Sequence, residues 1–451
     1  MGQSRGPWGL TWYQWAVIGA AWMGWGFDIF DALLFNYVAG NCVPTLTGKV
    51  LGSPEAREVT ALWTGRLTSI LLMGWAVGGI FFGWLADRVG RTRTLLFTIL
   101  LYSAGTALCA VAPNIWLLTL FRVISSLGIG GEWAAGAAMV AEVVPAHKRV
   151  EAGALLYTAA PAGLILASLV NETVAGNWLK STPESSWRYV FLFGLLPALA
   201  ALAMRLVLKE PETWIRGAQE SQPRLAELFS ARYRHLTLSG LVTAIIALIG
   251  WWSVSAFMPL VASGLASDWA ESQSIRGEAL ETLRQAWKTR ATYYFSLGGF
   301  IGTLATVPAS KYLGRKPMFG LYFTLSALAL GMTFGFQMEP TTRLAMFFLI
   351  GLSIFGVFGS FTYYLPELFP TRLRATGSGF CYNVGRIITA AGPLLVGIVA
   401  QQGHTRAMEV LLYLTLVPIC GLLLLPLVVE TKGKSLEEEI ARPEGAPPST
   451  S

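Results

Sequence analysis

The chain has 451 residues, of which 54% are hydrophobic and 13% are charged, with a formal net charge of +7. Soluble proteins carry about 25% charged residues, so this composition excludes an ordinary soluble enzyme and predicts a polytopic membrane protein. No basic run is interleaved with an exposed polar helix, so the positive charge indicates basic loops on the inner side of a membrane rather than a nucleic-acid surface.

Twelve apolar runs are each long enough to cross a bilayer as a helix. They lie at about 15–38, 62–85, 94–112, 115–138, 151–172, 188–207, 238–261, 292–312, 317–337, 343–365, 376–400 and 408–429. If the N-terminus is inside, the inner loops hold most of the lysines and arginines, which predicts that both termini are cytoplasmic. We therefore expect a multi-pass protein of the plasma (inner) membrane.

An internal repeat divides the chain. Glu142-x-x-Pro145-x-x-x-Arg149 recurs as Glu367-x-x-Pro370-x-x-x-Arg374 (367 − 142 = 225), and Gly90-Arg91 recurs as Gly314-Arg315 (314 − 90 = 224). Repeated halves place a substrate site between them, near the midplane. The predicted parts are an N-terminal six-helix half, a cytoplasmic linker, a C-terminal six-helix half and a cytoplasmic tail, at residues 1–207, 208–237, 238–429 and 430–451.

Two connections between the spans are expected to contain short helices. The segment Pro223–Phe229 in the linker predicts a short amphipathic helix at the membrane interface. Residues 262–291 predict a long charged outer loop in which 277–284 look helical. The four cysteines form no CxxC pair, so redox and metal roles are not expected of Cys42, Cys109, Cys381 and Cys420.

The first apolar run carries two acids, Asp28 and Asp31. Three positions apart, they share one face of a helix. Each charge near the bilayer centre costs about 2.5–3.5 kcal/mol on insertion scales, so this face should meet protein or a water-filled cavity. We expect the two carboxylates to bind and release protons; the alternative is that they only pair with a structural arginine.

The loop after the second span, Gly83-Trp-Leu-Ala-Asp87-Arg88-Val-Gly90-Arg91-Thr-Arg93, closely resembles the inner-loop motif of the major facilitator superfamily. The runs 366–377, 209–214 and 430–433 resemble its sugar-porter and organic-ion branches. Phe27-Asp28-Ile-Phe-Asp31 and Gly130-Gly-Glu132-Trp133 resemble its metabolite:proton symporters. The resemblance implies an all-α polytopic membrane protein with twelve transmembrane helices in two pseudo-symmetric halves. In the second copy of the motif, Lys311 stands where the first half has Asp87.

In the fold that the resemblance implies, the first and fourth helices face one cavity. Arg122 lies about seven residues into the fourth span, a depth of roughly 10 Å that matches Asp31. We expect Arg122 to pair with Asp31 or Asp28 and to modulate proton binding, as in related proton-coupled sugar porters; the alternative is a static brace. Glu132, deeper in the same span, is predicted to be either a proton step or an inner-gate partner.

Arg386 lies about ten residues into the eleventh span, roughly 15 Å from the inner surface. Asn383 and Tyr382 share its helical face. A guanidinium at this depth needs an anion, and its planar fork suits a carboxylate. We expect the substrate to supply it, as in the organic-anion carriers that this position resembles; the alternative is a pair with Asp28 or Asp31.

Aromatic side chains are expected to form part of the cavity wall, although aromatics near helix ends also serve as interface anchors. The candidates for substrate contact are Trp25, Trp252 and Tyr364. At the inner face, Asp87 can approach the N-terminal end of a neighbouring helix, where the dipole favours an anion. We expect an inner latch, which breaks during the transport cycle, from Asp87, Arg91, Glu142, Arg149, Arg315, Glu367 and Arg374.

These features predict a proton-coupled symporter of a small organic anion, such as a monocarboxylate, an aromatic acid or a sugar acid, working by alternating access. One rival is an uncoupled or proton-coupled transporter of a neutral sugar or metabolite; another is a non-transporting receptor with the same fold. No nucleophile–base pair or metal cluster stands at membrane depth, so we expect no enzyme, no metal and no cofactor besides the proton. The expected partners are the anion, protons and the bilayer, without nucleic acid, and the expected state is a monomer.

Overall fold

The computed structural model describes residues 7–51, 53–179, 181–210, 224–392 and 404–433, and the secondary structure of these ranges is helical. The predicted all-α class is therefore confirmed. Nine described segments are long and apolar enough to cross a membrane. Each of the twelve predicted spans overlaps described helix, although some run a few residues past a helix end, and residues 393–400 of the eleventh lie outside the described ranges.

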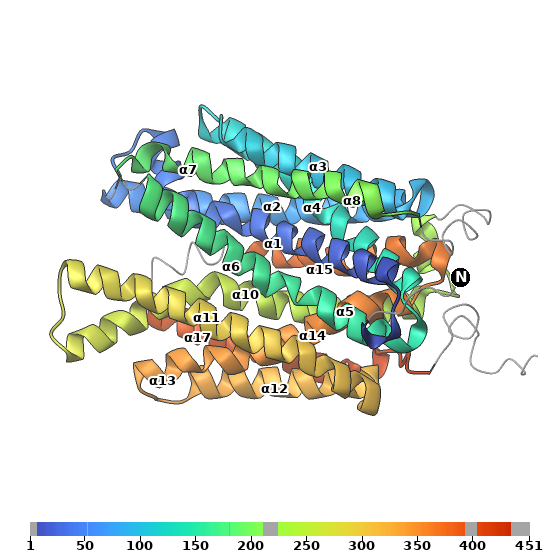
Figure 1. Ribbon diagram of the computed structural model, residues 1–451. Coiled ribbons are helices and arrows are strands. Elements are labelled where there is room, and N and C mark those ends of the chain that lie inside the picture. Colours follow the sequence, from blue (N-terminus) through green and yellow to red (C-terminus); the bar gives the residue numbers. More distant parts are fainter. Residues whose placement is uncertain (1–6, 52, 180, 211–223, 393–403, 434–451) are drawn as a thin grey trace, which may run out of the picture.

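The first half, as we name it, consists of α1 (Trp12–Thr47), α2 (Pro54–Val89), α3 (Arg91–Cys109), α4 (Ile115–Val143), α5 (Arg149–Tyr157), α6 (Ala159–Asn171), α7 (Pro183–Leu192) and α8 (Leu196–Val207). The second half consists of α10 (Arg234–Ser272), α11 (Glu278–Pro308), α12 (Arg315–Gly335), α13 (Pro340–Ala345), α14 (Phe347–Glu367), α15 (Arg374–Thr389), α17 (His404–Tyr413) and α18 (Leu416–Leu423). The two halves meet where α15 packs on α2 and α4, and where α14 packs on α5 (Figure 1).

A glycine and a distant glutamate define the turn between α2 and α3. Gly90 has φ 125°, a conformation that a side chain disfavours. Glu210 then accepts hydrogen bonds from the backbone nitrogens of Thr92 and Arg93, each at 3.1 Å. The carboxylate thereby satisfies two free N–H groups at the start of α3 and meets the positive end of its dipole.

The second half repeats this arrangement before α12. Gly314 has φ 101°. Glu430 accepts from the backbone nitrogens of Arg315 at 2.9 Å and Lys316 at 3.0 Å. The repeat read in the sequence is therefore also a repeat of backbone conformation and helix capping.

Close packing of α2 on α4 depends on small residues, as is usual between membrane helices. A Cβ atom on Gly78 would lie 2.0 Å from the carbonyl oxygen of Leu127, and one on Gly130 would lie 2.0 Å from that of Trp75. The backbones of the two helices touch here, which fixes the position of Trp75 in the interior.

The predicted outer loop at 262–291 is wrong in extent. Helix α10 continues to Ser272 and α11 begins at Glu278, so only residues 273–277 connect them. The two helices continue past the apolar runs because they support one another: Trp269 packs on Trp287 with ring centroids 6.0 Å apart, and Arg284 donates to Ser267 at 2.9 Å. The predicted helix at 277–284 is confirmed from Glu278 onward.

The described end of the linker forms a short 3₁₀ helix, Leu225–Phe229, within the segment for which a short amphipathic helix is predicted. Its Glu227 accepts from Arg372 at 2.5 Å, and this hydrogen bond lowers the pKa of the Glu227 carboxyl. The ring of Phe229 packs edge-on against Phe380 at 5.4 Å. The linker is thereby fastened to the beginning of α15.

Candidate functional site

The ionisable residues predicted at membrane depth all face the interior. Asp28 and Asp31 are 0% exposed, and Arg122, Glu132 and Arg386 are 1% exposed. They come from α1, α4 and α15, so the site is assembled from both halves. A charge in this position is surrounded by protein instead of lipid, as the cost of burying it in lipid requires.

Asp31 is the acid that pairs with Arg122. One Asp31 oxygen lies 3.5 Å from Arg122 Nη1, and the guanidinium also donates to the backbone oxygens of Asp31 at 3.2 Å and Ala32 at 3.1 Å. Ser125 donates to the Asp31 carboxylate at 2.6 Å, and Thr106 donates to it as well. Asp31 is thus provided with hydrogen-bond donors from α3 and α4, and the pair braces α1 against both.

Asp28 has a different environment. Neither of its carboxyl oxygens, nor either oxygen of Glu132, has a hydrogen-bond donor among the described residues. The side chains of Asp28 and Glu132 interact directly, and the charge of Arg386 acts on Asp28 without an ion pair. A hydrogen bond between two carboxyl groups requires a proton on one of them.

Arg386 is held by its own helix and by aromatic rings. Its Nη1 donates to Asn383 Oδ1 at 2.5 Å, and its buried Nε has no acceptor in the part of the chain that the structure describes. The guanidinium carbon lies 3.9 Å from the ring centroid of Trp75 and 4.4 Å from that of Tyr382. Among the described residues, no carboxylate forms an ion pair with it. Two ring faces orient the cation, but the rings carry no net charge that could neutralise it.

Further aromatic rings surround this guanidinium. Trp133 stacks on Tyr382 with centroids 4.2 Å apart, and Trp25 lies 5.6 Å from Tyr157. The indole nitrogens of Trp25, Trp75 and Trp133 are buried and have no acceptor among the described residues. The site therefore combines flat apolar faces with unused donors, which suits a planar ligand that carries oxygen atoms.

The other predicted substrate contacts differ in position. Trp252 packs edge-on against Trp75 at 6.3 Å, at the border of this cluster. The hydroxyl of Tyr364 instead bonds to Ser239 at 2.6 Å and to the backbone oxygen of Val429 at 2.9 Å. Tyr364 thus fastens α14 to α10 and to the segment after α18, and the structure does not place it beside Arg386.

Sequence reasoning missed Trp75, Trp133 and Tyr157. Trp133 follows Glu132 directly in a segment already singled out, so its place in the motif was a usable signal. Trp75 stands four residues before Gly79, and a Cβ atom on Gly79 would lie 2.0 Å from Asn383 Nδ2. That glycine lets α15 approach α2, which brings Arg386 onto the Trp75 ring.

The predicted latch residues gather at one end of the bundle, which we call the latch end. The Asp87 carboxylate of α2 accepts from the backbone nitrogens of Thr376 at 2.7 Å and Ala375 at 3.4 Å, at the N-terminus of α15. It also pairs with Arg91. The predicted approach of Asp87 to a helix N-terminus thus exists here, between the two halves.

Glu142 joins two arginines across the same seam. Its Oε1 lies 3.0 Å from Arg91 Nη2 and 3.2 Å from Arg374 Nη1. Arg91 also donates to the backbone oxygen of Thr371 at 3.0 Å. Since Arg91 and Glu142 belong to the first half and Arg374 to the second, these contacts join the two halves at the latch end.

The repeat mates of these residues form a second group. Arg315 donates to both oxygens of Glu367, at 2.9 and 3.1 Å, and Thr431 donates to Glu367 at 2.6 Å. The Nε of Arg149 donates to the backbone oxygen of the residue eight positions earlier at 2.7 Å, and the Nε of Arg374 does the same at 3.2 Å. Both copies of the motif therefore use one geometry.

One latch contact was not predicted. Lys311, in the turn Ala309–Leu313 after α11, lies 2.5 Å from Glu151 near the start of α5. Lys311 stands at the repeat position of Asp87 (311 − 87 = 224), and Glu151 at that of Thr376 (376 − 151 = 225). The second half thus makes the corresponding bridge to the first with the charge reversed.

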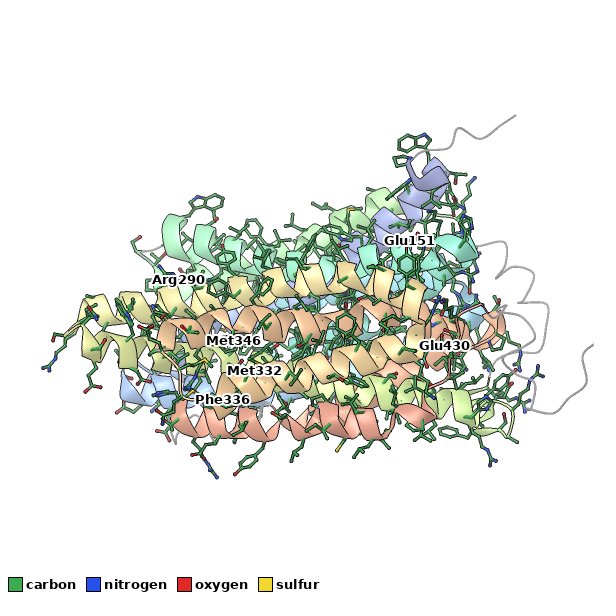
Figure 2. The ribbon with its side chains drawn as sticks, turned by 90° about the horizontal axis from the view of Figure 1, so that it is seen from below. Glu151, Arg290, Met332, Phe336, Met346 and Glu430 are labelled. Atoms are coloured by element: carbon green, nitrogen blue, oxygen red, sulfur yellow. The ribbon has the colours of Figure 1, made fainter. Side chains whose placement is uncertain are left out.

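Glu151 and Glu430 both lie at the latch end of the bundle, whereas Arg290 lies toward the other end (Figure 2).

Reversing the charges of this bridge tests it directly. We expect Lys311→Glu or Glu151→Lys alone to destabilise the latch end through like-charge contact, and the double exchange to recover most of the loss. Because Lys311 is partly exposed, the expected coupling is only about 1 kcal/mol. Thermal unfolding of the four proteins in detergent measures it. Additive effects of the two changes would show that the residues do not interact.

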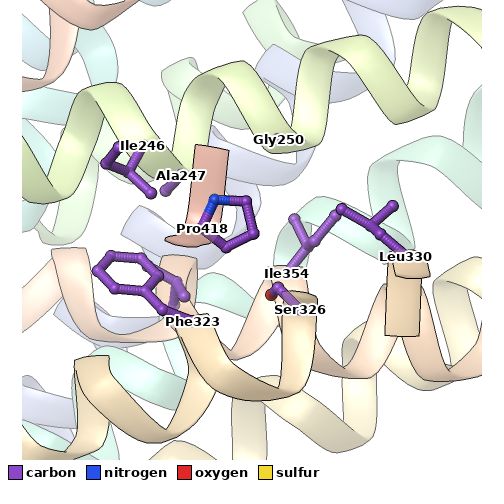
Figure 3. A pocket seen from close by; sticks show the side chains of 9 residues that line it. Ile246, Ala247, Gly250, Phe323, Ser326, Leu330, Ile354 and Pro418 are labelled. Atoms are coloured by element: carbon purple, nitrogen blue, oxygen red, sulfur yellow. The ribbon is translucent and has the colours of Figure 1, made fainter. Parts of the chain in front are cut away.

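An apolar pocket lies elsewhere in the described part of the chain. It is enclosed by α10, α12, α14 and α18, with Gly250, Phe323, Leu330, Ile354 and Pro418 among its lining residues (Figure 3). It contains no ionisable side chain, so it does not contribute to the charged cluster. The described residues also contain no group of His, Cys, Asp or Glu side chains that could hold a metal.

Comparisons with known proteins agree with this arrangement. The profile of the Major Facilitator Superfamily matches residues 32–275 and 285–450. A probable 4-methylmuconolactone transporter of Cupriavidus pinatubonensis is 31% identical over 93% of this chain and 91% of its own length, and a gentisate transporter of Corynebacterium glutamicum is 26% identical over 84% and 81%. The solved proton:xylose symporter XylE is 18% identical, with a TM-score of 0.74 over 94% of this chain and 98% of its own.

These matches cover nearly the whole chain, and the relatives that they name are transporters. A multi-pass helical bundle with buried charges between two repeated halves is thus a membrane transporter and not an enzyme. This chain belongs to the Major Facilitator Superfamily.

Proposed function

We propose that this protein is a proton-coupled symporter that carries a small organic anion by alternating access. The observation that carries the proposal is the state of Arg386, which is buried between Trp75 and Tyr382 without an ion pair to a described carboxylate. An arginine stays protonated in proteins, so a buried one needs an anion. A substrate carboxylate supplies this anion, and it can bind the guanidinium through two parallel hydrogen bonds.

The predicted substrates are a monocarboxylate, an aromatic acid or a sugar acid, and the surroundings of Arg386 favour an acid with a flat body. The rings of Trp75, Trp133 and Tyr382 offer stacking faces, and the free indole nitrogens offer donors for further oxygens. The relatives named for 4-methylmuconolactone and gentisate agree with this choice. A monocarboxylate with an aromatic or unsaturated body is therefore preferred over a sugar acid, and a neutral sugar is the remaining rival.

Proton coupling is assigned to the acids of α1. Asp28 has no hydrogen-bond donor among the described residues, and the charge of Arg386 acts on it. The protonation of Asp28 therefore depends on whether an anion is bound to Arg386. Asp31 and Arg122 hold α1 against α4, and Arg122 modulates the site by breaking or keeping this pair. The named proton symport of XylE, which shares the fold, supports coupling by analogy.

The latch end is assigned to the cytoplasmic side of the plasma membrane, with both termini there. The basic residues of the inter-helix turns cluster at this end, as the positive-inside rule expects. In the conformation described, the latch is closed, so the central site is closed off from this side. A monomer suffices for the cycle, because the two halves form the site by themselves.

Uptake into proteoliposomes tests the function. Purified protein is reconstituted with an imposed pH gradient, acid outside, and screened with benzoate, gentisate, gluconate and xylose as labelled probes. The expected result is accumulation of an acid that collapses with a protonophore. Uptake of xylose alone, or uptake insensitive to the gradient, would favour the neutral or uncoupled alternative; binding without flux would favour a receptor.

Asp28→Asn separates coupling from binding. The amide cannot ionise, so we expect substrate exchange across the membrane to continue while accumulation driven by a pH gradient falls to the uncoupled level. Counterflow and gradient-driven uptake, measured on the same proteoliposomes, give the two readouts. Asp268→Asn, at a half-exposed acid that pairs with His404 at 2.9 Å, is the matched control and should retain both. Undiminished accumulation in Asp28→Asn would remove Asp28 from the coupling step.

A further inference from the structure

The carboxyl group of Glu132 rests on the surface of α1, beside Asp28. A Cβ atom on Gly24 would lie 2.1 Å from Glu132 Oε1, so the acid occupies the space that a side chain at position 24 would fill. Gly24 and Asp28 are four residues apart and therefore share one face of α1. The glycine thus makes the place in which two carboxyl groups from α1 and α4 meet.

The groups around this pair leave it short of positive charge. Asp31 on α1, Tyr102 on α3, Arg122 on α4 and Arg386 on α15 are the titratable groups whose charges act on it or next to it. Arg122 is engaged by Asp31 and by backbone oxygens. The charge of Arg386 acts on Asp28 without forming an ion pair. Neither Asp28 nor Glu132 has a hydrogen-bond donor among the described residues.

Two adjacent buried carboxylates that have no described ion-pair partner cannot both stay ionised, because burial and mutual repulsion both disfavour the second charge. One proton between them removes the repulsion and supplies the missing hydrogen bond. A purely structural Glu132 would be expected to have protein donors, as Asp31 has from Ser125, Thr106 and Arg122. Glu132 has none among the described residues.

We propose that Glu132 is a positioning residue for proton binding, which shares one proton with Asp28 in a pocket made by Gly24. The pair then carries a single negative charge opposite Arg386. When a substrate carboxylate binds Arg386, it takes the place of that charge. A hydronium ion then transfers its proton to the remaining carboxylate, so that one O–H bond of the hydronium breaks, one forms on the carboxyl group and water is left. One anion and one proton enter the site together, so its net charge does not change. This consequence rests on the proposed function; the shared proton itself does not.

Infrared spectroscopy tests the shared proton without a substrate. Protonated buried carboxyl groups have a C=O stretching band of their own, which pH-difference spectra of the purified full-length protein in detergent can follow. The double variant D28N/E132Q lacks both acids and supplies the baseline. In Glu132→Gln, the residue next to Asp28 can no longer carry a negative charge. The midpoint pH at which Asp28 loses its proton should therefore lie about one pH unit or more below the midpoint of the carboxyl band in wild type. Glu132→Asp keeps a carboxyl group and should retain most of the wild-type behaviour.

Gly24→Ala tests the geometry, with Gly26→Ala as its matched control on the same helix. The added methyl group at position 24 would displace the Glu132 carboxyl, whereas one at position 26 would make only ordinary contacts, at 3.5 Å or more, with Ala159. We expect the pH midpoint of the carboxyl band in Gly24→Ala to shift in the same direction as in Glu132→Gln. The midpoint in Gly26→Ala should stay at the wild-type value.

The outcomes distinguish this inference from the function it deepens. Equal midpoints in wild type and Glu132→Gln would overturn the shared proton, whatever the transport assays show. A shifted midpoint in a protein whose uptake ignores the pH gradient would support the pair and overturn proton coupling. If Glu132→Gln does not fold, Glu132→Asp and Gly24→Ala still decide the question, because each leaves a carboxyl group at position 132.

Discussion

Replacing Arg386 with alanine is expected to abolish binding of the organic anion while the protein remains folded. The guanidinium is the buried cation without an ion pair to a described carboxylate, and truncating one partner of a buried charge pair costs about 2–5 kcal/mol. Affinity should therefore fall at least about 30-fold, by roughly a factor of ten for each 1.4 kcal/mol. Calorimetric titration of the purified variant with the acid found in the uptake screen measures the loss.

Arg386→Lys refines this test. Lysine keeps the charge but offers a point contact in place of a planar fork, and it loses the stacking on Trp75 and Tyr382. We expect it to recover only part of the affinity. Arg406→Ala removes an arginine of α17 whose side chain is 52% exposed, and it should bind as wild type does. Wild-type affinity in Arg386→Ala would mean that the substrate is not held as an anion at this place.

Much of the framework could be predicted because membrane burial restricts what a sequence can do. An acid or an arginine inside an apolar run has to face protein, so the positions of Asp28, Asp31, Arg122 and Arg386 in the sequence are enough to identify the inward faces of α1, α4 and α15. The repeated glutamate, proline and arginine spacing likewise identifies the latch residues. In both cases, a charged side chain that faced lipid or lost its partner would cost several kcal/mol. The positions of these residues in the sequence therefore indicate where they lie in the structure.

The partners could not be predicted with the same certainty. Asp28 and Asp31 share a helical face, and the sequence does not show that Arg122 pairs with Asp31, which also accepts from the hydroxyls of Thr106 and Ser125. Trp75 in the site and Tyr364 outside it look alike in sequence, because aromatic residues serve as core, anchor or cavity wall. The bridge from Lys311 to Glu151 was hidden because its charges are reversed relative to the first half.

Glu142→Gln is expected to open the latch end. The amide leaves Arg374 without its carboxylate and Arg91 with Asp87 alone, although both guanidinium groups are buried. Removing one partner of a buried ion pair costs about 3–5 kcal/mol, and here the cost falls on the closed conformation, since the bridge crosses between the halves. A shift of this size changes the ratio of closed to open protein by about two orders of magnitude or more.

Glu367→Gln is the matched control for this change. Glu367 is the repeat mate of Glu142, but its partner Arg315 belongs to the second half and its partner Thr431 to the segment that follows that half, so neither comes from the first half. Its loss should lower stability without moving the two halves apart. Spin labels at Arg88 and Tyr312, in a background where the exposed Cys420 is replaced by serine, report the distance across the latch end. Equal distance distributions in the two variants would show that the ion pair between Glu142 and Arg374 does not control opening, and that the latch depends on Asp87 and the N-terminus of α15 instead.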